Sequence, residues 1–134
     1  MKITAGANVL VRAAVMDDPA QSAVAIQTLL EAEVVVVTIP SLCEFVWVLM
    51  RGYKKNAAEV AVAVRTLAES TSVHVDRPAV EAGLSVLERG GDFADGVIAF
   101  EGRRAGGLVF ASFDLEAVKL IEETGGAARL LSGS

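Results

Sequence analysis

Short runs of β-branched and other apolar residues alternate along the chain with longer segments of helical spacing. The clearest run is four consecutive valines at positions 34–37. A continuous run of this kind is typical of a strand covered on both faces, as in a parallel sheet between helices. Further strands are predicted at residues 2–5, 72–75, 108–112 and 127–131, and helices at residues 8–16, 20–31, 40–53, 57–70, 78–89, 92–104 and 115–123. The alternation predicts an α/β fold, a three-layer sandwich with a small, mostly parallel central sheet flanked by helices.

Capping and breaking residues indicate where these helices begin and end. Asp18 precedes Pro19, and proline is favoured in the first turn of a helix. Asn56 followed by Glu59 is the signature of a capping box. The apolar side chains expected to face the core of the protein, from these helices and from the turn before the last one, are Val24, Leu29, Leu30, Phe93, Phe100 and Phe113.

Composition limits the class of protein. The chain has 134 residues, which predicts a single domain over residues 1–134, and 53% of them are hydrophobic. Mean hydropathy is high at +0.50, yet charges or glycines interrupt every apolar run before it reaches the length of a membrane span. The first residues lack the pattern of a signal peptide, and the single Cys43 suits a reducing compartment, so we expect a cytoplasmic protein that binds no membrane.

The net charge bears on possible partners. The formal net charge is −5, which argues against binding nucleic acid through bulk electrostatics. A nucleic-acid enzyme stays possible, because a local basic rim and a bound divalent cation can reverse the potential at one site.

Acidic residues at predicted junctions of strands and helices are the candidates for chemistry. Asp92 and Asp95 lie where a Gly-Gly break meets the helix at 92–104. Glu44 and Asp114 follow two predicted strands. Each has a purely structural interpretation, because aspartates cap helices and Ser41-x-x-Glu44 reads as a capping box.

Taken together, the acids predict a metal site. Ligand sites of parallel sheets lie at the carboxyl ends of strands, and carboxylates gathered there repel one another unless a cation joins them. Oxygen ligands suit Mg²⁺ or Mn²⁺, which can activate water and stabilise a phosphodiester in transit. The only histidine, His74, is expected to be structural.

Five short motifs occur in order along the chain. They are Asn8-Val9-Leu10-Val11-Arg12, Asp17-Asp18-Pro19, Leu42-Cys43-Glu44-Phe45-Val46-Trp47-Val48-Leu49, Phe93-Ala94-Asp95-Gly96-Val97-Ile98-Ala99 and Ser112-Phe113-Asp114. Together they resemble the PIN-domain family and, within it, the VapC-type toxins of bacterial toxin–antitoxin pairs. The resemblance covers nearly the whole chain.

The resemblance implies a metal-dependent ribonuclease that uses Mg²⁺ or Mn²⁺, is usually a homodimer and is held inactive by a VapB-type antitoxin. The family's acidic set carries over to Glu44, Asp95 and Asp114, with Asp92 as an accessory ligand or a cap. Ser112 and Asn8 match the supporting hydroxyl and amide of the family's motifs.

The opening motif departs from the family. It normally reads Asp-Thr-Asn-Val-Leu, and here it reads Gly6-Ala7-Asn8-Val9-Leu10. Gly6 therefore replaces an acidic ligand, and we expect a toxin whose RNA cleavage is impaired or absent. Natural decay and a deliberate change in a harmful toxin would both explain this replacement.

Two other interpretations stay open. One is a non-catalytic module that sequesters, or co-represses with, a VapB-type antitoxin; the other, ranked last, is a small phosphate-handling domain with an acidic metal pocket. Trp47 is expected to pack in the core or a dimer interface, with stacking on RNA bases as the alternative. The basic residues that could follow a phosphate backbone are Arg12, Arg51, Lys54, Lys55, Arg103 and Arg104.

Overall fold

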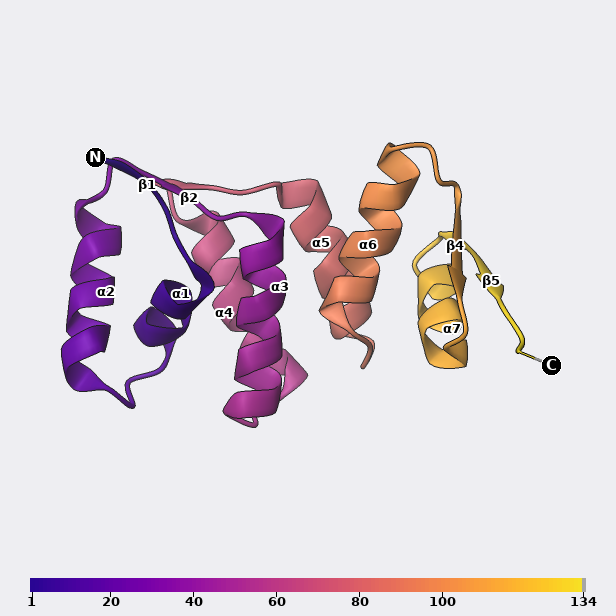
Figure 1. The fold of residues 1–134 in the computed structure, drawn as a ribbon, viewed down its shortest axis with the longest axis horizontal. Helices are drawn as coiled ribbons and strands as arrows, with labels where there is room; N and C mark the ends of the chain where they lie inside the picture. The colour runs from indigo at the N-terminus through magenta and orange to yellow at the C-terminus, as the bar shows by residue number, and fades with distance from the viewer. Residues whose placement is uncertain (134) are drawn as a thin grey trace. The chain divides into compact units, whose positions relative to one another are not determined.

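The computed structural model describes residues 1–133 and has an α/β fold with parallel strands flanked by helices (Figure 1). This confirms the predicted fold class. The chain divides into two compact units, Met1–Asp76 and Arg77–Ser134, and each has its own sheet and helices. No helix in the described part of the chain is both long and apolar enough to cross a membrane.

The first unit is built around a three-stranded parallel sheet. Its elements are β1 (Lys2–Thr4), α1 (Ala7–Ala14), α2 (Pro19–Glu31), β2 (Val34–Val36), α3 (Ile39–Trp47), η1 (Val48–Gly52), α4 (Ala57–Glu69) and β3 (Val73–His74). β2 lies between β1 and β3, with Val35 opposite both Ile3 and Val73. Val35 and Val37 are 1% and 2% exposed, whereas Val36 between them is 37% exposed, so one face of β2 is buried and the predicted covering of both faces is wrong.

Side-chain caps fix the helix starts of this unit. Asp18 accepts a hydrogen bond from the Gln21 backbone N–H at 3.1 Å, and Pro19 is the first residue of α2. Asn56 and Glu59 form the predicted capping box of α4, with hydrogen bonds of 2.8 and 3.1 Å. Both predictions are confirmed.

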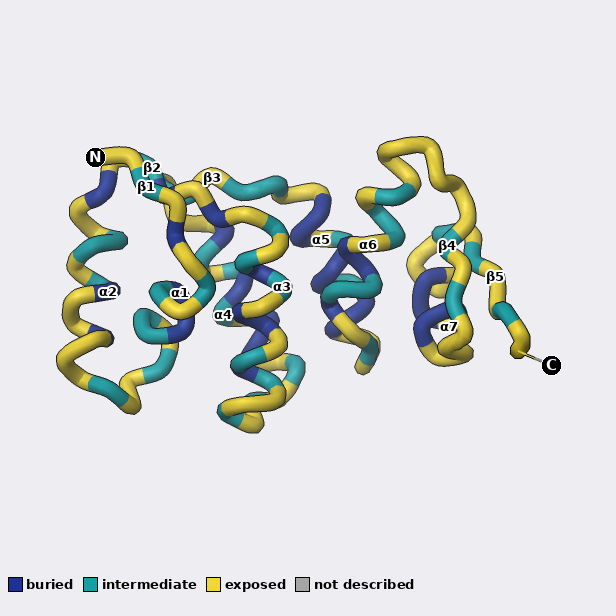
Figure 2. Tube along the Cα trace, in the orientation of Figure 1, coloured by how far each residue is buried: buried dark blue, intermediate teal, exposed yellow. Residues whose placement is uncertain are grey.

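Helix α2 buries a different face from the one predicted. Val24 and Leu30 are 67% and 80% exposed, whereas Ser22 and Ala25 are buried. The Ser22 hydroxyl donates to the Val15 carbonyl at 3.1 Å, so the small residues of α2 face inward, toward the chain that leaves α1. Figure 2 shows α2 as largely exposed, in contrast to the buried α5 of the second unit.

The second unit joins a helix pair to a two-stranded parallel sheet. Its elements are α5 (Arg77–Leu87), α6 (Phe93–Arg104), β4 (Val109–Ser112), α7 (Leu115–Glu123) and β5 (Ala127–Leu130). Phe110 lies opposite Ala128 in the sheet, and both pack on the buried cluster of Val86, Leu120 and Ile121. Gly90 and Gly106 have φ values of +91° and +106°, which explains why glycines end α5 and precede β4.

Glycines also allow α5 and α6 to pack closely. The Phe93 ring, 1% exposed, lies against Gly83, where a Cβ atom would stand 2.5 Å from the ring. A Cβ atom on Gly96 would stand 2.4 Å from the Ala82 carbonyl oxygen. Phe93 is therefore a core residue as predicted, but Phe113 is 70% exposed, and its predicted burial is wrong.

Candidate functional site

Asp92 and Asp114 both begin helices. The Asp92 Oδ1 atom accepts a hydrogen bond from the Ala94 backbone N–H at 2.9 Å at the start of α6. The Asp114 Oδ1 atom accepts from the backbone N–H groups of Glu116 and Ala117, at 2.9 and 3.3 Å, at the start of α7. The capping interpretation of these two residues is therefore confirmed, and each cap uses one carboxylate oxygen.

Asp95 differs from its two neighbours. It lies half-buried in the first turn of α6 and accepts no capping hydrogen bond. Burial raises the pKa of the Asp95 carboxyl above its ordinary value, and the negative charges of Asp92 and Asp114 raise it further. The structure thus places Asp95 close enough to both Asp92 and Asp114 for their charges to oppose its ionisation, and a cation beside Asp95 would relieve that repulsion.

Ser112 holds the turn that leads to Asp114. It is the last residue of β4, and its Oγ accepts a hydrogen bond from the Asp114 backbone N–H at 3.0 Å. This contact fixes the backbone from which the Asp114 carboxylate projects. Ser112 therefore positions the backbone at the start of α7, and its supporting role in a metal site stays a prediction.

The carboxylates of this unit suit a divalent cation in chemistry, although they do not enclose one. Within residues 1–133 no three histidine, cysteine or acidic side chains gather as a set that could hold a metal ion. Mg²⁺ is commonly bound through one or two carboxylates with waters completing its octahedron, so a larger enclosed set of ligands is not required for binding.

The first unit carries the remaining predicted residues. Glu44 lies exposed on α3, and Gly6 begins α1 without a side-chain cap. The Ser41 hydroxyl lies 3.4 Å from the Ala5 carbonyl oxygen, so the first turn of α3 meets the end of β1 beside Gly6. Asn8 is exposed in the first turn of α1. Glu44 as a metal ligand stays a prediction.

The predicted capping box of Ser41 and Glu44 is wrong. Helix α3 begins at Ile39, and the Thr38 side chain caps it by accepting from the Ser41 backbone N–H at 3.3 Å. The signal was present in the sequence, because Pro40 is favoured in a first turn that follows a threonine. Glu44 is therefore free of a capping role.

The predicted basic residues have unequal surroundings. Arg12 donates to Asp17, Gln21 and Tyr53 at 2.8, 2.8 and 3.3 Å, and the Tyr53 hydroxyl donates to Asp17 at 2.8 Å. The hydrogen bond to Tyr53 raises the pKa of Arg12. This network was not predicted, because Tyr53 lies far in sequence from Arg12 and Asp17. The Arg12 side chain therefore serves to join α1 to the segments that carry Asp17 and Tyr53.

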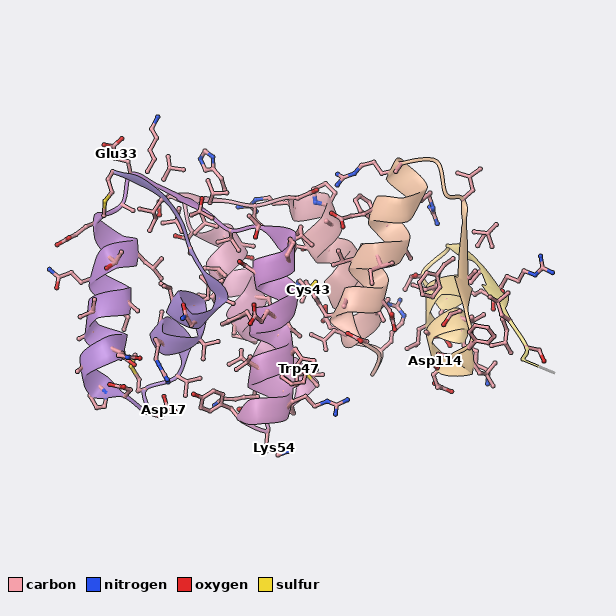
Figure 3. All side chains as sticks on the ribbon, in the orientation of Figure 1. Asp17, Glu33, Cys43, Trp47, Lys54 and Asp114 are labelled. Atoms are coloured by element: carbon pink, nitrogen blue, oxygen red, sulfur yellow. The ribbon has the colours of Figure 1, made fainter. Side chains whose placement is uncertain are left out.

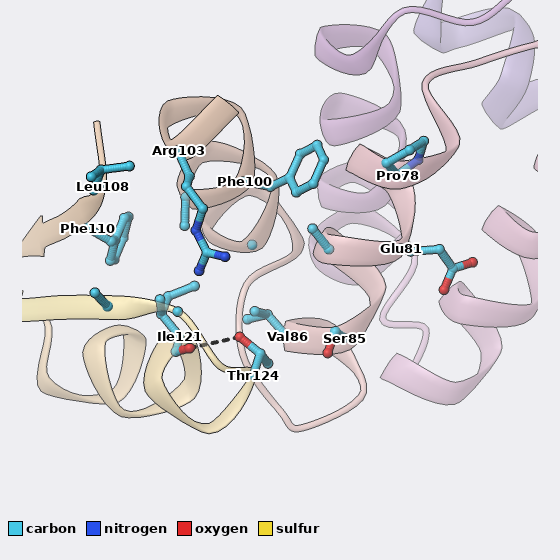
Figure 4. A pocket seen from close by; sticks show the side chains of 15 residues that line it. Pro78, Glu81, Ser85, Val86, Phe100, Arg103, Leu108, Phe110, Ile121 and Thr124 are labelled. Atoms are coloured by element: carbon cyan, nitrogen blue, oxygen red, sulfur yellow. Dashed lines mark hydrogen bonds between the residues drawn. The ribbon is translucent and has the colours of Figure 1, made fainter. Parts of the chain in front are cut away.

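A cavity of about 320 Å³ lies in the second unit, between α5 and α6 on one side and the ends of β4 and α7 on the other (Figure 4). Its wall includes Val86, Phe110, Ile121 and the Arg103 side chain. The Thr124 hydroxyl donates to the Ile121 carbonyl at 2.8 Å beside it. None of the predicted acidic residues lines this cavity, so the cavity is separate from the candidate metal ligands Asp92, Asp95 and Asp114.

Comparison with known proteins identifies one family. A family model described as PIN domain matches residues 7–122, which is most of the chain and includes all of the acidic residues discussed above. No curated protein and no solved structure gives a significant match.

Proposed function

Since the chain belongs to the PIN domain family, whose members are generally nucleases that use divalent metal ions, we propose that it is a VapC-type toxin, an Mg²⁺- or Mn²⁺-dependent endoribonuclease whose metal site is impaired. The observation that carries this proposal is the match of the PIN domain model over residues 7–122, and the raised pKa of the half-buried Asp95 beside Asp92 and Asp114 supports it. Negative charge concentrated at the carboxyl end of a parallel strand is the expected setting of a cation site.

The ligands proposed for the metal ion are Glu44, Asp95 and Asp114, with Asp92 as an accessory group. Of the three aspartates, Asp95 is the one that caps no helix, so its carboxylate is available to a cation. Ser112 orients Asp114 through the hydrogen bond to its backbone. A bound Mg²⁺ or Mn²⁺ would supply Lewis-acid activation of water and would neutralise charge on the phosphodiester.

The proposed impairment lies at Gly6. Its φ of −71° and ψ of 157° are open to any residue, and a Cβ atom there would meet only the Asn8 Oδ1 atom, at 3.4 Å. An aspartate would therefore fit at this position. It would also cap α1, whose first turn has no side-chain cap.

An aspartate at position 6 would add both a helix cap and a metal ligand, and the test must separate these two effects. Calorimetric binding of Mn²⁺ and Mg²⁺ is measured on the unaltered protein, on Gly6→Asp and on Gly6→Asn. Asparagine caps a helix about as well as aspartate but carries no charge. We expect metal binding to tighten only in Gly6→Asp, while both variants gain thermal stability. Equal binding in all three proteins would refute the role assigned to position 6.

RNA cleavage is then assayed in Mg²⁺ on the unaltered protein and on Gly6→Asp combined with Ala7→Thr. We expect the restored protein to cleave RNA faster, and the added substitution Asp95→Asn to abolish the gain. A restored protein as inactive as the original would mean that the missing acid does not account for the loss.

A non-catalytic module is the second candidate function, and the glycine at position 6 favours it. In that case the chain would bind a VapB-type antitoxin, as a homodimer, without cleaving RNA. Antitoxin binding that persists in Asp95→Asn, together with no cleavage by the restored protein, would support this candidate over the nuclease.

A further inference from the structure

An exposed aromatic and basic surface lies at the end of α3. Trp47 is 62% exposed, although Phe45 two residues earlier is 2% exposed in the core, so the two aromatic side chains of this helix lie on different faces. Of the two packing sites predicted for Trp47, the core is therefore wrong, and a dimer interface stays a prediction. Arg51 and Lys54 are also exposed, and Figure 3 shows Trp47 and Lys54 toward the same end of the helix.

The backbone of this segment is unusual and well anchored. Helix α3 continues into the π-turn η1, closed by a hydrogen bond from the Tyr53 N–H to the Val48 carbonyl at 3.2 Å. Lys54 follows with a φ of +56°, a conformation that lysine seldom adopts. The Tyr53 hydroxyl, held by Asp17, anchors the turn. π-turns within helices are frequent at functional sites.

Positive charge is concentrated beside Trp47. Three of the twelve basic residues, Arg51, Lys54 and Lys55, fall within five positions of a chain whose net charge is −5. Neither Arg51 nor Lys54 forms an ion pair within residues 1–133. Trp47 follows Glu44 by three residues on α3, so the surface begins one helical turn from a proposed metal ligand.

We propose that this surface, made of Trp47, Arg51 and Lys54, binds single-stranded RNA. Trp47 provides an indole face on which a base stacks, and the two cations contact flanking phosphates. The inference rests on the proposed ribonuclease function and assigns the substrate a path along α3 away from Glu44. A two-fold contact with a second copy is less favourable here, because it would bring two sets of unpaired cations together.

The single tryptophan makes the surface directly observable. Trp47 fluorescence is titrated with oligouridylate in EDTA, where no metal-dependent cleavage occurs. We expect saturable quenching that weakens with salt. Arg51→Gln and Lys54→Gln should each reduce the slope of log K against log salt by about 0.7, the value for one phosphate contact on a single strand.

Fluorescence anisotropy of a labelled oligouridylate tests the stacking residue itself. Trp47→Ala should weaken binding roughly 5- to 150-fold, the effect of losing one stacked base, and Trp47→Phe should weaken it less. Val62→Ala removes a side chain of similar exposure, 65%, from α4 and should leave binding unchanged. Circular dichroism verifies that each variant is folded.

Three outcomes would overturn the proposal: no quenching, unchanged affinity in Trp47→Ala, or conversion of a dimer into a monomer by Trp47→Ala at unchanged RNA affinity. The last would assign the surface to contact between copies. Failure of the nuclease proposal is distinguishable, because RNA would then quench Trp47 in EDTA while the restored protein cleaves nothing in Mg²⁺.

Discussion

The contact between α5 and α6 makes a sharp prediction about a single methyl group. Gly96 faces α5, and a Cβ atom there would stand 2.4 Å from the Ala82 carbonyl oxygen and 2.9 Å from the Gly83 Cα atom. Both of these are backbone atoms, so no side-chain rotation can relieve the clash. Gly96→Ala therefore requires the two helices to separate locally by about 1 Å, if an ordinary van der Waals contact is to be restored.

Two opposing terms set the magnitude. Alanine favours an α-helix over glycine by about 1 kcal/mol. Against this, overpacking of a close core contact costs typically 1–3 kcal/mol, and a gap of 0.5–1 Å between helices forfeits a quarter to a half of the dispersion energy of the atoms that line it. Because the clash is with backbone, the upper end of that range applies. We expect Gly96→Ala to lower the free energy of unfolding by about 1–2 kcal/mol.

The same helix offers a matched control. Gly102 also lies within α6, but a Cβ atom there would meet only the Gly107 carbonyl oxygen, at 3.9 Å. Gly102→Ala is the identical chemical change without the clash, and it should raise the free energy of unfolding by up to about 1 kcal/mol. Urea unfolding followed by far-ultraviolet circular dichroism measures both variants against the unaltered protein.

The opposite signs are the test. If Gly96→Ala is neutral or stabilising, the close approach of α5 and α6 does not depend on the missing Cβ atom, and the account of this packing is wrong. If both variants are destabilised alike, a property of alanine in α6 other than contact with α5 is responsible.

Three further predictions concern individual side chains. The folded protein holds the Asp95 proton more tightly than the unfolded chain does. The gain in stability from Asp95→Asn should therefore grow as the pH rises from the ordinary aspartate pKa toward neutrality. Thermal unfolding at several pH values measures this growth. Asp114→Asn should retain the cap of α7 and hence the melting temperature of the protein. Asp114→Ala removes the cap and should lower the free energy of unfolding, measured in urea, by about 1 kcal/mol. Tyr53→Phe removes the hydroxyl shared by Asp17 and Arg12 and should lower the melting temperature without changing the helix content seen by circular dichroism.

The order and type of the elements could be predicted because each strand and helix has its own local signal. The valine run at 34–37 forms β2 as predicted, although Val36 is exposed and only one face of the strand is buried, and Asn56 with Glu59 closes its capping box as expected. The buried face of α2 could not be predicted, because the apolar residues of that helix are spread over several of its faces. Val24 and Leu30 are larger than Ala25, yet Ser22 and Ala25 are the buried residues, and the Ser22 hydroxyl donates to the Val15 carbonyl beyond the end of α1.

The exposure of Trp47 on α3 could not be predicted for a different reason. Nearly every position from Leu42 to Met50 is apolar, so the sequence does not show which of these side chains face the core. The π-turn at Val48–Gly52 breaks the regular helical spacing only after Trp47. Networks that join distant segments, such as Arg12 with Tyr53, leave no periodic signal at all. Local order was thus readable from the sequence, whereas contacts that depend on the tertiary structure were not.

The acidic residues show why capping and metal binding cannot be separated from sequence alone. A carboxylate at a helix start serves the backbone with one oxygen, as Asp92 and Asp114 do through Oδ1, and the second oxygen stays available to a cation. The two roles therefore select the same residue at the same position. Among the three aspartates only Asp95 has no capping role, and its burial beside two like charges works against the stability of its ionised form. Its substitution removes no helix cap, so Asp95 is the acid whose substitution best discriminates between the nuclease and the binding module.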